Sequence, residues 1–208
     1  MKNQLSNLAK TSMITLLSIY AIAISSCQKE ELVPPEIIPA HSTSAEESKI
    51  KPPEVPDIIK VPEGNKVIWH AYASGVQIYQ VTQSLTDPTV YLWTFIAPSA
   101  TLYGNSSYST VVGTHYAGPT WQATVGRKAG QFVVGLKLQS SIVDATAVAW
   151  LLLQSVPSSD VNYYDQVTYI QRVNTTGGLA PVTGADADHL GEQASIPYTA
   201  EYYFYGAN

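Results

Sequence analysis

Cysteine is nearly absent from this sequence: among 208 residues there is one, Cys27. A single cysteine leaves no partner for a disulfide within the chain. The folded part must therefore be held together by packing and hydrogen bonds.

Basic residues are also scarce. The chain has 11 lysines and arginines against 16 aspartates and glutamates, a formal net charge of -5 and an isoelectric point near 5.3. A nucleic-acid-binding protein needs a basic face that neutralises phosphates. We therefore expect no nucleic acid among the partners of this protein.

Phenylalanine is rare among the aromatic residues, with three Phe against 14 Tyr and four Trp. Tyrosine suits half-buried strand positions and also polar surfaces that face a ligand. The bias therefore favours a β-rich fold more strongly than it favours a binding function.

Several chemical signatures are missing from the sequence. No Gly-x-Gly-x-x-Gly joins a strand to a helix, so no nicotinamide cofactor is expected. No Gly-x-Ser-x-Gly elbow presents a nucleophilic serine, and no His-x-x-x-His pair supports a zinc site. The sequence predicts no cofactor and no metal site.

Residues 1–26 have the pattern of a lipoprotein signal peptide. Lys2 and Lys10 flank a polar start, and residues 13–24 form an almost wholly apolar run that is too short to span a bilayer. Residues 24–27, Ile-Ser-Ser-Cys, resemble the bacterial lipobox, in which the cysteine receives the lipid. We expect Cys27 to carry acyl chains such as palmitate, each contributing about 0.8 kcal/mol per buried CH2 group to membrane binding.

The next residues predict the cellular location of the lipoprotein. Residues 28–31, Gln-Lys-Glu-Glu, resemble a lysine-plus-acidic signal that sends some Gram-negative lipoproteins to the cell surface. We expect a lipid-anchored protein of the outer membrane, exposed at the cell surface, with the periplasmic face as the alternative. Residues 27–59 are rich in proline and charge and are expected to be a linker without regular structure, followed by a β domain over residues 60–206.

Short apolar or alternating stretches follow one another from residue 60 onward, separated by Gly, Pro, Asn and Asp. They predict roughly ten strands, at residues 66–73, 76–82, 91–97, 101–103, 111–116, 121–125, 131–138, 148–156, 167–174 and 195–205. Asp186 has the position of an N-cap for one short helix near residues 186–192. The fold class expected is therefore mainly β, an antiparallel β-sandwich or barrel.

Three strand details bear on a possible site. Ser74-Gly75 is expected to reverse the chain as a hairpin turn, after which Gln77 and Tyr79 share a face whose direction, inward or outward, stays open. Residues 148–156 are expected to be a strand buried on both faces. Arg172 stands alone on a largely apolar strand, and we expect Glu201 to be its partner.

Unusual residues gather in the stretch 111–121, Val-Val-Gly-Thr-His-Tyr-Ala-Gly-Pro-Thr-Trp. Its Gly-Pro turn should bring His115, Tyr116 and Trp121 together at one end of the sheet, where sites are often carried on such folds. Two alternatives stay open at this stage. His115 either belongs to a site or is satisfied by backbone groups, and Trp121 either stacks on a sugar or plugs the interior.

A series of motifs runs through the domain in order. They are Val-Pro-Glu-Gly at 61–64, Gly-Val-Gln-Ile-Tyr at 75–79, Trp93 with Phe-Ile-Ala-Pro at 95–98, Gly-Thr-His-Tyr-Ala-Gly-Pro-Thr-Trp at 113–121, Trp-Leu-Leu-Leu at 150–153, Ile-Gln-Arg at 170–172 with Thr-Gly-Gly at 176–178, and the tyrosine-rich residues 198–205. Together they resemble the domain of unknown function 3455 family of secreted bacterial and fungal proteins. The resemblance implies no activity. Some fungal relatives carry a malate dehydrogenase label, which this sequence does not support because it has no dinucleotide-binding motif.

The same resemblance implies a contact. Relatives often have cysteines at the positions of Val81 and Ala185, so we expect these two side chains to touch, as the members of a lost disulfide would. The loop that carries Asp186 and His189 would then close over the end of the sheet that holds Gln77 and Tyr79.

The main hypothesis is a surface-anchored β domain that binds an extracellular small ligand or glycan. Its candidate binding residues are Gln77, Tyr79, His115, Tyr116, Trp121, Asp186 and His189. Two alternatives remain: a secreted metal-assisted hydrolase that uses His115, Asp186 and His189, and a structural envelope protein without a small-molecule site. The geometry that distinguishes them is whether His115 and His189 face one cleft.

Overall fold

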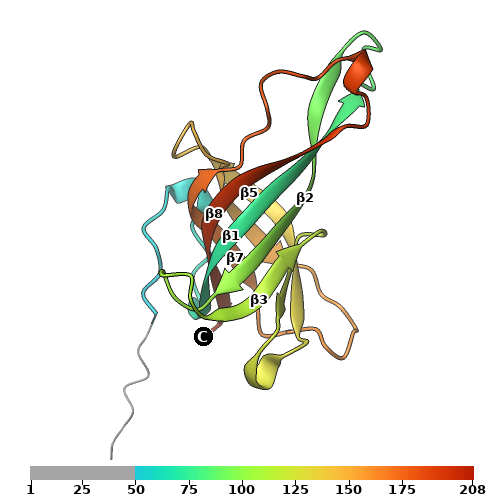
Figure 1. Ribbon diagram of the computed structural model, residues 1–208. Coiled ribbons are helices and arrows are strands. Elements are labelled where there is room, and N and C mark those ends of the chain that lie inside the picture. Colours follow the sequence, from blue (N-terminus) through green and yellow to red (C-terminus); the bar gives the residue numbers. More distant parts are fainter. Residues whose placement is uncertain (1–49) are drawn as a thin grey trace, which may run out of the picture. The chain divides into compact units, whose positions relative to one another are not determined.

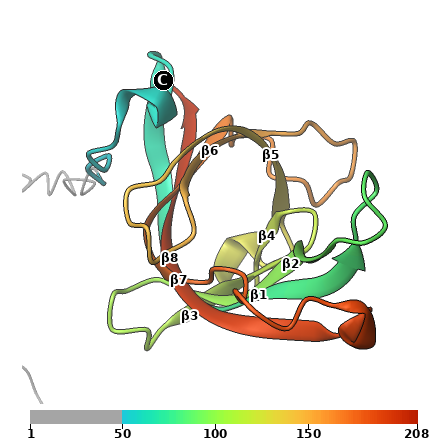
Figure 2. The ribbon, with the colours of Figure 1, turned by 90° about the horizontal axis from the view of Figure 1, so that it is seen from above.

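The computed structural model describes residues 50–208; the expected signal peptide, Cys27 and residues 28–49 of the expected linker lie outside the described residues. Eight antiparallel strands form a closed barrel (Figures 1 and 2). Each strand pairs with the next one along the chain, and the last pairs with the first. The strands are β1 Asn65–Gln83, β2 Tyr91–Tyr103, β3 Val111–Tyr116, β4 Thr120–Ala123, β5 Phe132–Ser141, β6 Trp150–Ser155, β7 Tyr169–Gly177 and β8 Gln193–Ala207. The mainly β prediction is confirmed, and the sheet is a barrel.

The expected hairpin turn at Ser74-Gly75 is wrong, because β1 runs through both residues without interruption. Gly75 is needed there for close packing. A Cβ on Gly75 would lie 2.1 Å from the carbonyl oxygen of Ser99 on β2. Glycine in a strand often marks such a close approach of two backbones in a curved sheet, so the residue that predicts a turn in the sequence marks a strand contact in the structure.

The expected break at Pro98 is wrong as well, since β2 continues through it to Tyr103. Pro98 faces Gln77 of β1, whereas β3 pairs with β2 only from Ala100 onward. The first part of β2 therefore has a paired neighbour on one side only. Proline lacks an N–H and is tolerated at such an edge, so two expected strands are one.

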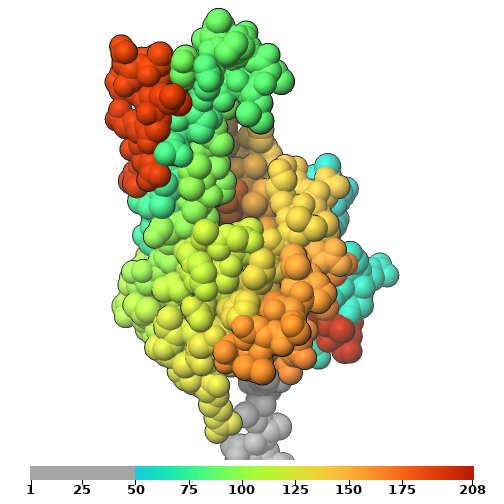
Figure 3. Space-filling view, turned by 90° about the vertical axis from the view of Figure 1, so that its right-hand side faces the viewer, coloured from blue at the N-terminus to red at the C-terminus, as the bar shows by residue number. Residues whose placement is uncertain are grey.

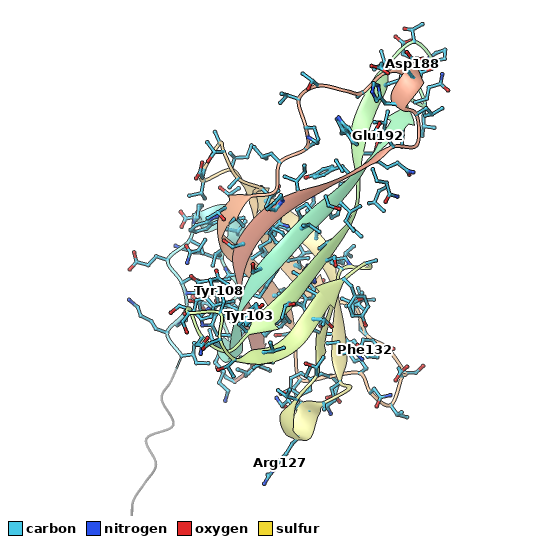
Figure 4. The ribbon with its side chains drawn as sticks, viewed as in Figure 1. Tyr103, Tyr108, Arg127, Phe132, Asp188 and Glu192 are labelled. Atoms are coloured by element: carbon cyan, nitrogen blue, oxygen red, sulfur yellow. The ribbon has the colours of Figure 1, made fainter. Side chains whose placement is uncertain are left out.

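The end of β1, the start of β2 and the chain that leads into β8 extend beyond the ring as a projection (Figure 1). We call this projection, residues 79–95 and 183–194, the finger. The 3-10 helix η3, Ala187–His189, lies at its tip, where Figure 4 shows Asp188 and Glu192. The carboxylate of Asp186 accepts hydrogen bonds from the backbone N–H groups of Asp188 and His189. The predicted N-cap is confirmed, although the helix is a single 3-10 turn.

The core fills the barrel with side chains from alternate strand positions. It combines small residues on β1 with large ones on the facing strands, among them Ala71, Ala73, Leu102, Trp121, Leu153, Ile170 and Phe204. Small residues on β1 leave room for the indole and phenyl rings opposite. None of the helices within residues 50–208 is long and apolar enough to cross a membrane.

The outer face of the barrel is partly covered by the chain before β1. The 3-10 helix η1, Asp57–Ile59, contacts β5 and β6, and Ile59 is fully buried. Gln171 donates a hydrogen bond to the carbonyl oxygen of Ile59 at 2.6 Å. Consecutive residues Leu152 and Leu153 of β6 point to opposite faces and are both buried, so the strand predicted to be buried on both faces is confirmed.

Candidate functional site

Two connected cavities open from the barrel interior at the end that carries the finger. Their volumes are about 380 and 530 Å³, and both are lined by Gln77, Phe95, Lys137, Leu151 and Arg172. We treat them as one space, the upper cavity. Figure 3 shows the surface hollowed between the β1–β2 hairpin and the segment that joins β5 to β6. A volume of this size lies in the usual range for small-molecule sites.

Polar side chains enter this cavity from four different strands. Gln77 on β1, His115 on β3 and Tyr202 on β8 are only 2%, 3% and 1% exposed, and all three line the cavity with Arg172 of β7. Each points inward because side chains alternate along a strand. The inward direction of Gln77, which the sequence left open, is therefore set by the closure of the barrel.

Several of these buried groups lack a hydrogen-bond partner. Within residues 50–208 the Gln77 Nε2, Tyr198 hydroxyl, Tyr202 hydroxyl and Trp121 Nε1 atoms are buried with none. The Tyr198 hydroxyl lies close to Tyr202 and Gln77, and the Tyr202 hydroxyl close to Arg172, but none of these pairs has hydrogen-bond geometry. A buried polar group without a partner costs about 1–3 kcal/mol. Four of them around one interior are an unusual concentration that calls for an explanation.

Arg172 supplies a positive charge to the cavity. Its Nε and Nη2 atoms donate to the carbonyl oxygen of Ala149 at 3.2 and 2.8 Å. The expected partner Glu201 is wrong: Arg172 is paired across the sheet with Tyr202, and Glu201 with Val173. Neighbouring positions on a strand face opposite sides, so Arg172 points inward and Glu201 outward.

Glu201 takes part in a separate cluster on the outer face. Its carboxylate contacts His70 Nε2 at 2.9 Å and accepts a hydrogen bond from Asn174 at 3.0 Å. The Tyr203 hydroxyl donates to the same carboxylate at 3.2 Å. The acid is fully occupied there, so it does not neutralise the interior.

His115 is held in a single neutral form. Its Nδ1 atom donates to the carbonyl oxygen of Thr120 at 2.8 Å, which leaves Nε2 unprotonated. Burial, assisted by the nearby charge of Arg172, lowers the pKa of His115 to about 3. At neutral pH this imidazole is uncharged and is not matched to general acid–base chemistry.

Trp121 is a plug of the interior and not a platform for a sugar. It is paired with His115 across the β3–β4 hairpin and is 2% exposed. Its indole contacts the rings of His115, Tyr202 and Phe204. Between these two residues Tyr116 points the other way, is 39% exposed, and donates a hydrogen bond to Gln122. The predicted cluster therefore contains His115 and Trp121 but excludes Tyr116.

Tyr79 joins Gln77 at the mouth of the upper cavity. Its hydroxyl donates to the carbonyl oxygen of Gly178 at 2.7 Å, so it tethers the loop after β7 to β1. Of the predicted binding residues, the structure thus gathers Gln77, Tyr79, His115 and Trp121 around one interior.

Asp186 and His189 are elsewhere. His189 Nδ1 lies 2.5 Å from an Asp186 carboxylate oxygen, and both side chains are about half exposed on the finger. The loop that carries them forms backbone hydrogen bonds with Val81 of β1. Gly75, six residues earlier on β1, pairs with Ala100 of β2, and Ala100 pairs with His115 of β3. At about 3.3 Å per residue the separation is roughly 20 Å. His115 and His189 share no cleft, and the set expected for a hydrolase is not assembled.

Metal ligands do not gather within the described part of the chain either: no group of three or more His, Cys, Asp or Glu side chains lies close enough to hold an ion. The polar interior is instead built from amide, hydroxyl, indole, guanidinium and imidazole groups. Apart from the unprotonated Nε2 atom of His115, which accepts, these groups can donate hydrogen bonds.

Sequence reasoning missed three contributors to this interior: Lys137, Tyr198 and Tyr202. Tyr198 and Tyr202 stand four residues apart on one face of β8, a spacing that was visible in the alternation of that strand. The sequence indicates Arg172 as well, but as half of a structural ion pair with Glu201. Without the register between β7 and β8, nothing in the sequence could tell that it faces these tyrosines.

A third cavity, of about 300 Å³, lies at the other end of the barrel and is mostly apolar, with Trp69, Trp121, Phe132 and Phe204 in its lining. Figure 4 shows Arg127 and Phe132 at this end, opposite to Asp188 on the finger. Trp121 lines both this lower cavity and the upper one. The indole therefore lies between a mostly apolar lower part and an upper part that carries the buried polar groups.

These features define a class: closed antiparallel β-barrels of eight strands whose interior holds a cavity. The chain belongs to the family described as "Protein of unknown function (DUF3455)", whose family model matches residues 62–206. No curated protein and no solved structure matches the chain. The family description names no activity, so the function must be argued from the interior of the barrel.

Proposed function

We propose that this protein is a binding protein that holds a small extracellular ligand in the upper cavity of its barrel. The observation that carries the proposal is the set of buried, unpartnered polar atoms around that cavity. In a protein without a ligand such groups are a cost to folding. A ligand that supplies the missing hydrogen bonds turns this cost into affinity and specificity.

Glycan binding is the weaker form of the proposal. The ring expected to stack on a sugar face is that of Trp121, and it is covered by His115 and Tyr202. The cavity lining includes Phe95, Ile96 and Leu153 besides its polar groups. A compact ligand with an apolar part fits this lining better than a polar oligosaccharide.

The location of the protein is part of the proposal. The sequence features around Cys27 support a lipid-anchored protein of the outer membrane, with the barrel held outside the bilayer by the linker. Metabolic labelling with a radioactive palmitate tests the anchor. Wild-type protein should be labelled and remain with the membrane fraction, whereas Cys27→Ser should lose the label; equal labelling of both would contradict the assignment.

A neutral fluorescent probe tests whether the cavity binds ligands at all. N-phenyl-1-naphthylamine, whose emission rises in apolar surroundings, should bind the purified full chain with saturation. Leu151 lines both parts of the upper cavity, so Leu151→Trp should fill it and weaken probe binding about tenfold or more, an effect of about 1.4 kcal/mol.

The matched control is Leu138→Trp, which adds the same ring to a β5 residue that is 40% exposed and lines none of the cavities described above. Its probe affinity should equal that of the wild type. Equal binding by the Leu151→Trp protein, or no saturable binding by the wild type, would overturn the proposed function.

A further inference from the structure

Hydrogen-bond donors converge on one part of the upper cavity. Gln77, Arg172 and Tyr202 line it, and Tyr198, which is not among the lining residues, lies next to Gln77 and Tyr202; we call these four residues the donor pocket. The unpartnered atom of Gln77 is its amide nitrogen, a donor only, and the two tyrosine hydroxyls can each donate. Burial raises the pKa of Tyr202, so its hydroxyl keeps the proton that it would donate. The Gln77 nitrogen therefore requires an acceptor, and the two hydroxyls, which can also accept, can donate to the same one.

The charge of the cavity points to an anion. Arg172 and Lys137 both line it, and none of the lining residues is Asp or Glu. Within residues 50–208 Arg172 forms no ion pair with a carboxylate. A charge that is partly removed from water is costly unless it is paired. The interior is thus positive in a chain whose formal net charge is -5.

The guanidinium of Arg172 leaves a particular edge available. Nε and Nη2 both donate to one carbonyl oxygen, that of Ala149. An arginine has five N–H donors, so Nη1 and the second hydrogen of Nη2 remain. This Nη1–Nη2 edge is one that pairs with a carboxylate through two parallel hydrogen bonds.

The rest of the lining is apolar and determines the other half of the ligand. It contains Phe95, Ile96, Pro98, Leu136, Leu151 and Leu153. An inorganic anion would leave this surface in contact with water. A molecule with one anionic head and an apolar body covers it and gains hydrophobic free energy.

We infer that the donor pocket binds the carboxylate of a small amphipathic organic acid, with the apolar part of the acid against the leucines and Phe95. The inference rests on the proposed ligand-binding function and names the chemical class of its ligand. Arg172 pairs with the carboxylate, Gln77 and the tyrosine hydroxyls complete its hydrogen bonds, and Lys137 attracts the anion from the mouth.

Calorimetric titration with octanoate and octanamide tests this assignment, because the two probes share an alkyl chain and differ in charge. The full chain should bind octanoate at least tenfold more tightly than octanamide. Arg172→Gln should reduce octanoate affinity to the level of octanamide and change octanamide affinity far less than octanoate affinity. Arg127→Gln, which removes a cation from the rim of the lower cavity, should change neither.

A second variant guards against misfolding of the Arg172 protein. Tyr202→Phe removes one donor and leaves the ring in place, and it should weaken octanoate binding about threefold to tenfold while the protein stays folded. Equal affinity for both probes, or octanoate binding that is insensitive to Arg172→Gln and Tyr202→Phe, would overturn the inference. If the neutral naphthylamine probe binds but octanoate does not, the ligand class is wrong and the binding function stands; if neither binds, both fail.

Discussion

The imidazole of His115 lies flat against the indole of Trp121, with 4.4 Å between the ring centroids and 9° between the planes. The two residues face each other across the β3–β4 hairpin. Trp121 lines both cavities and His115 only the upper one, so the stack stands between the two with the imidazole on the upper side. The stretch that stood out in the sequence is therefore a partition inside the barrel, with one face toward the proposed ligand.

The buried state of His115 predicts acid sensitivity. Its pKa of about 3 in the folded protein is below the pKa of 6.5 expected for a histidine in the unfolded chain. Unfolding therefore takes up a proton between these values. The stability from the neutral imidazole is fully present above pH 6.5 and is lost as the pH falls toward 3, by up to about 1.4 kcal/mol per pH unit.

We expect His115→Gln, which stays neutral and keeps a donor for Thr120, to lose less stability between pH 7 and pH 5 than the wild type. Urea unfolding at the two pH values measures the difference. His189→Gln is the control, since the pKa of that exposed histidine is raised by its hydrogen bond to Asp186. A raised pKa stabilises the folded protein at low pH, so the His189→Gln protein should lose at least as much stability between pH 7 and pH 5 as the wild type. An unchanged loss in the His115→Gln protein would contradict the assignment.

Replacing tyrosine by phenylalanine should have opposite effects on stability at two positions of β8. The Tyr202 hydroxyl is buried without a partner, whereas the Tyr205 hydroxyl donates to Gln171 at 2.5 Å. Without ligand, Tyr202→Phe should raise the free energy of unfolding by about 1 kcal/mol, and Tyr205→Phe should lower it by about 1–2 kcal/mol. Urea denaturation of the purified proteins measures both. Destabilisation by Tyr202→Phe would mean that its hydroxyl has a structural partner.

Gly75 should tolerate no side chain. A Cβ there would lie 2.1 Å from the Ser99 carbonyl oxygen and 2.5 Å from the Ala100 Cα. Gly75→Ala should destabilise the barrel by about 1–3 kcal/mol or more, because backbone atoms cannot move aside as a flexible side chain can. Thermal unfolding measures the change, with Ser74→Ala on the outward face as the control. Equal melting temperatures of the two variants would argue against the continuous strand β1.

The expected contact between Val81 and Ala185 stays a prediction, but the finger supports it. Val81 exchanges backbone hydrogen bonds with Gly191 and Glu192, and its cross-strand neighbour Trp93 donates to the Thr183 carbonyl. In a Cys27→Ser background, Val81→Cys with Ala185→Cys should oxidise to a disulfide that protects the finger from proteolysis. Mass spectrometry detects the bond. Two free thiols after mild oxidation would place the side chains apart.

Local chemistry explains which elements the sequence predicted well. The cap at Asp186 was found because a carboxylate and the N–H groups that it accepts from are only two and three residues apart. Most strands were found because alternation is a property of consecutive residues. The hairpin at Ser74-Gly75 was a misreading, since glycine marks both a turn and a close approach of two strands, and only the second strand distinguishes them.

The sequence by itself determined that the domain is mainly β, which residues share a strand face, and that Cys27 stands in a lipobox-like context. Only the tertiary structure decided that the sheet closes, that Gln77 and Arg172 point into the ring, and that Glu201 points away from it. The register between β7 and β8 separates Arg172 from Glu201, and the pairing of β8 with β1 converts one face of every strand into an interior. Pairing between residues more than a hundred positions apart depends on the whole barrel, and no local pattern encodes it.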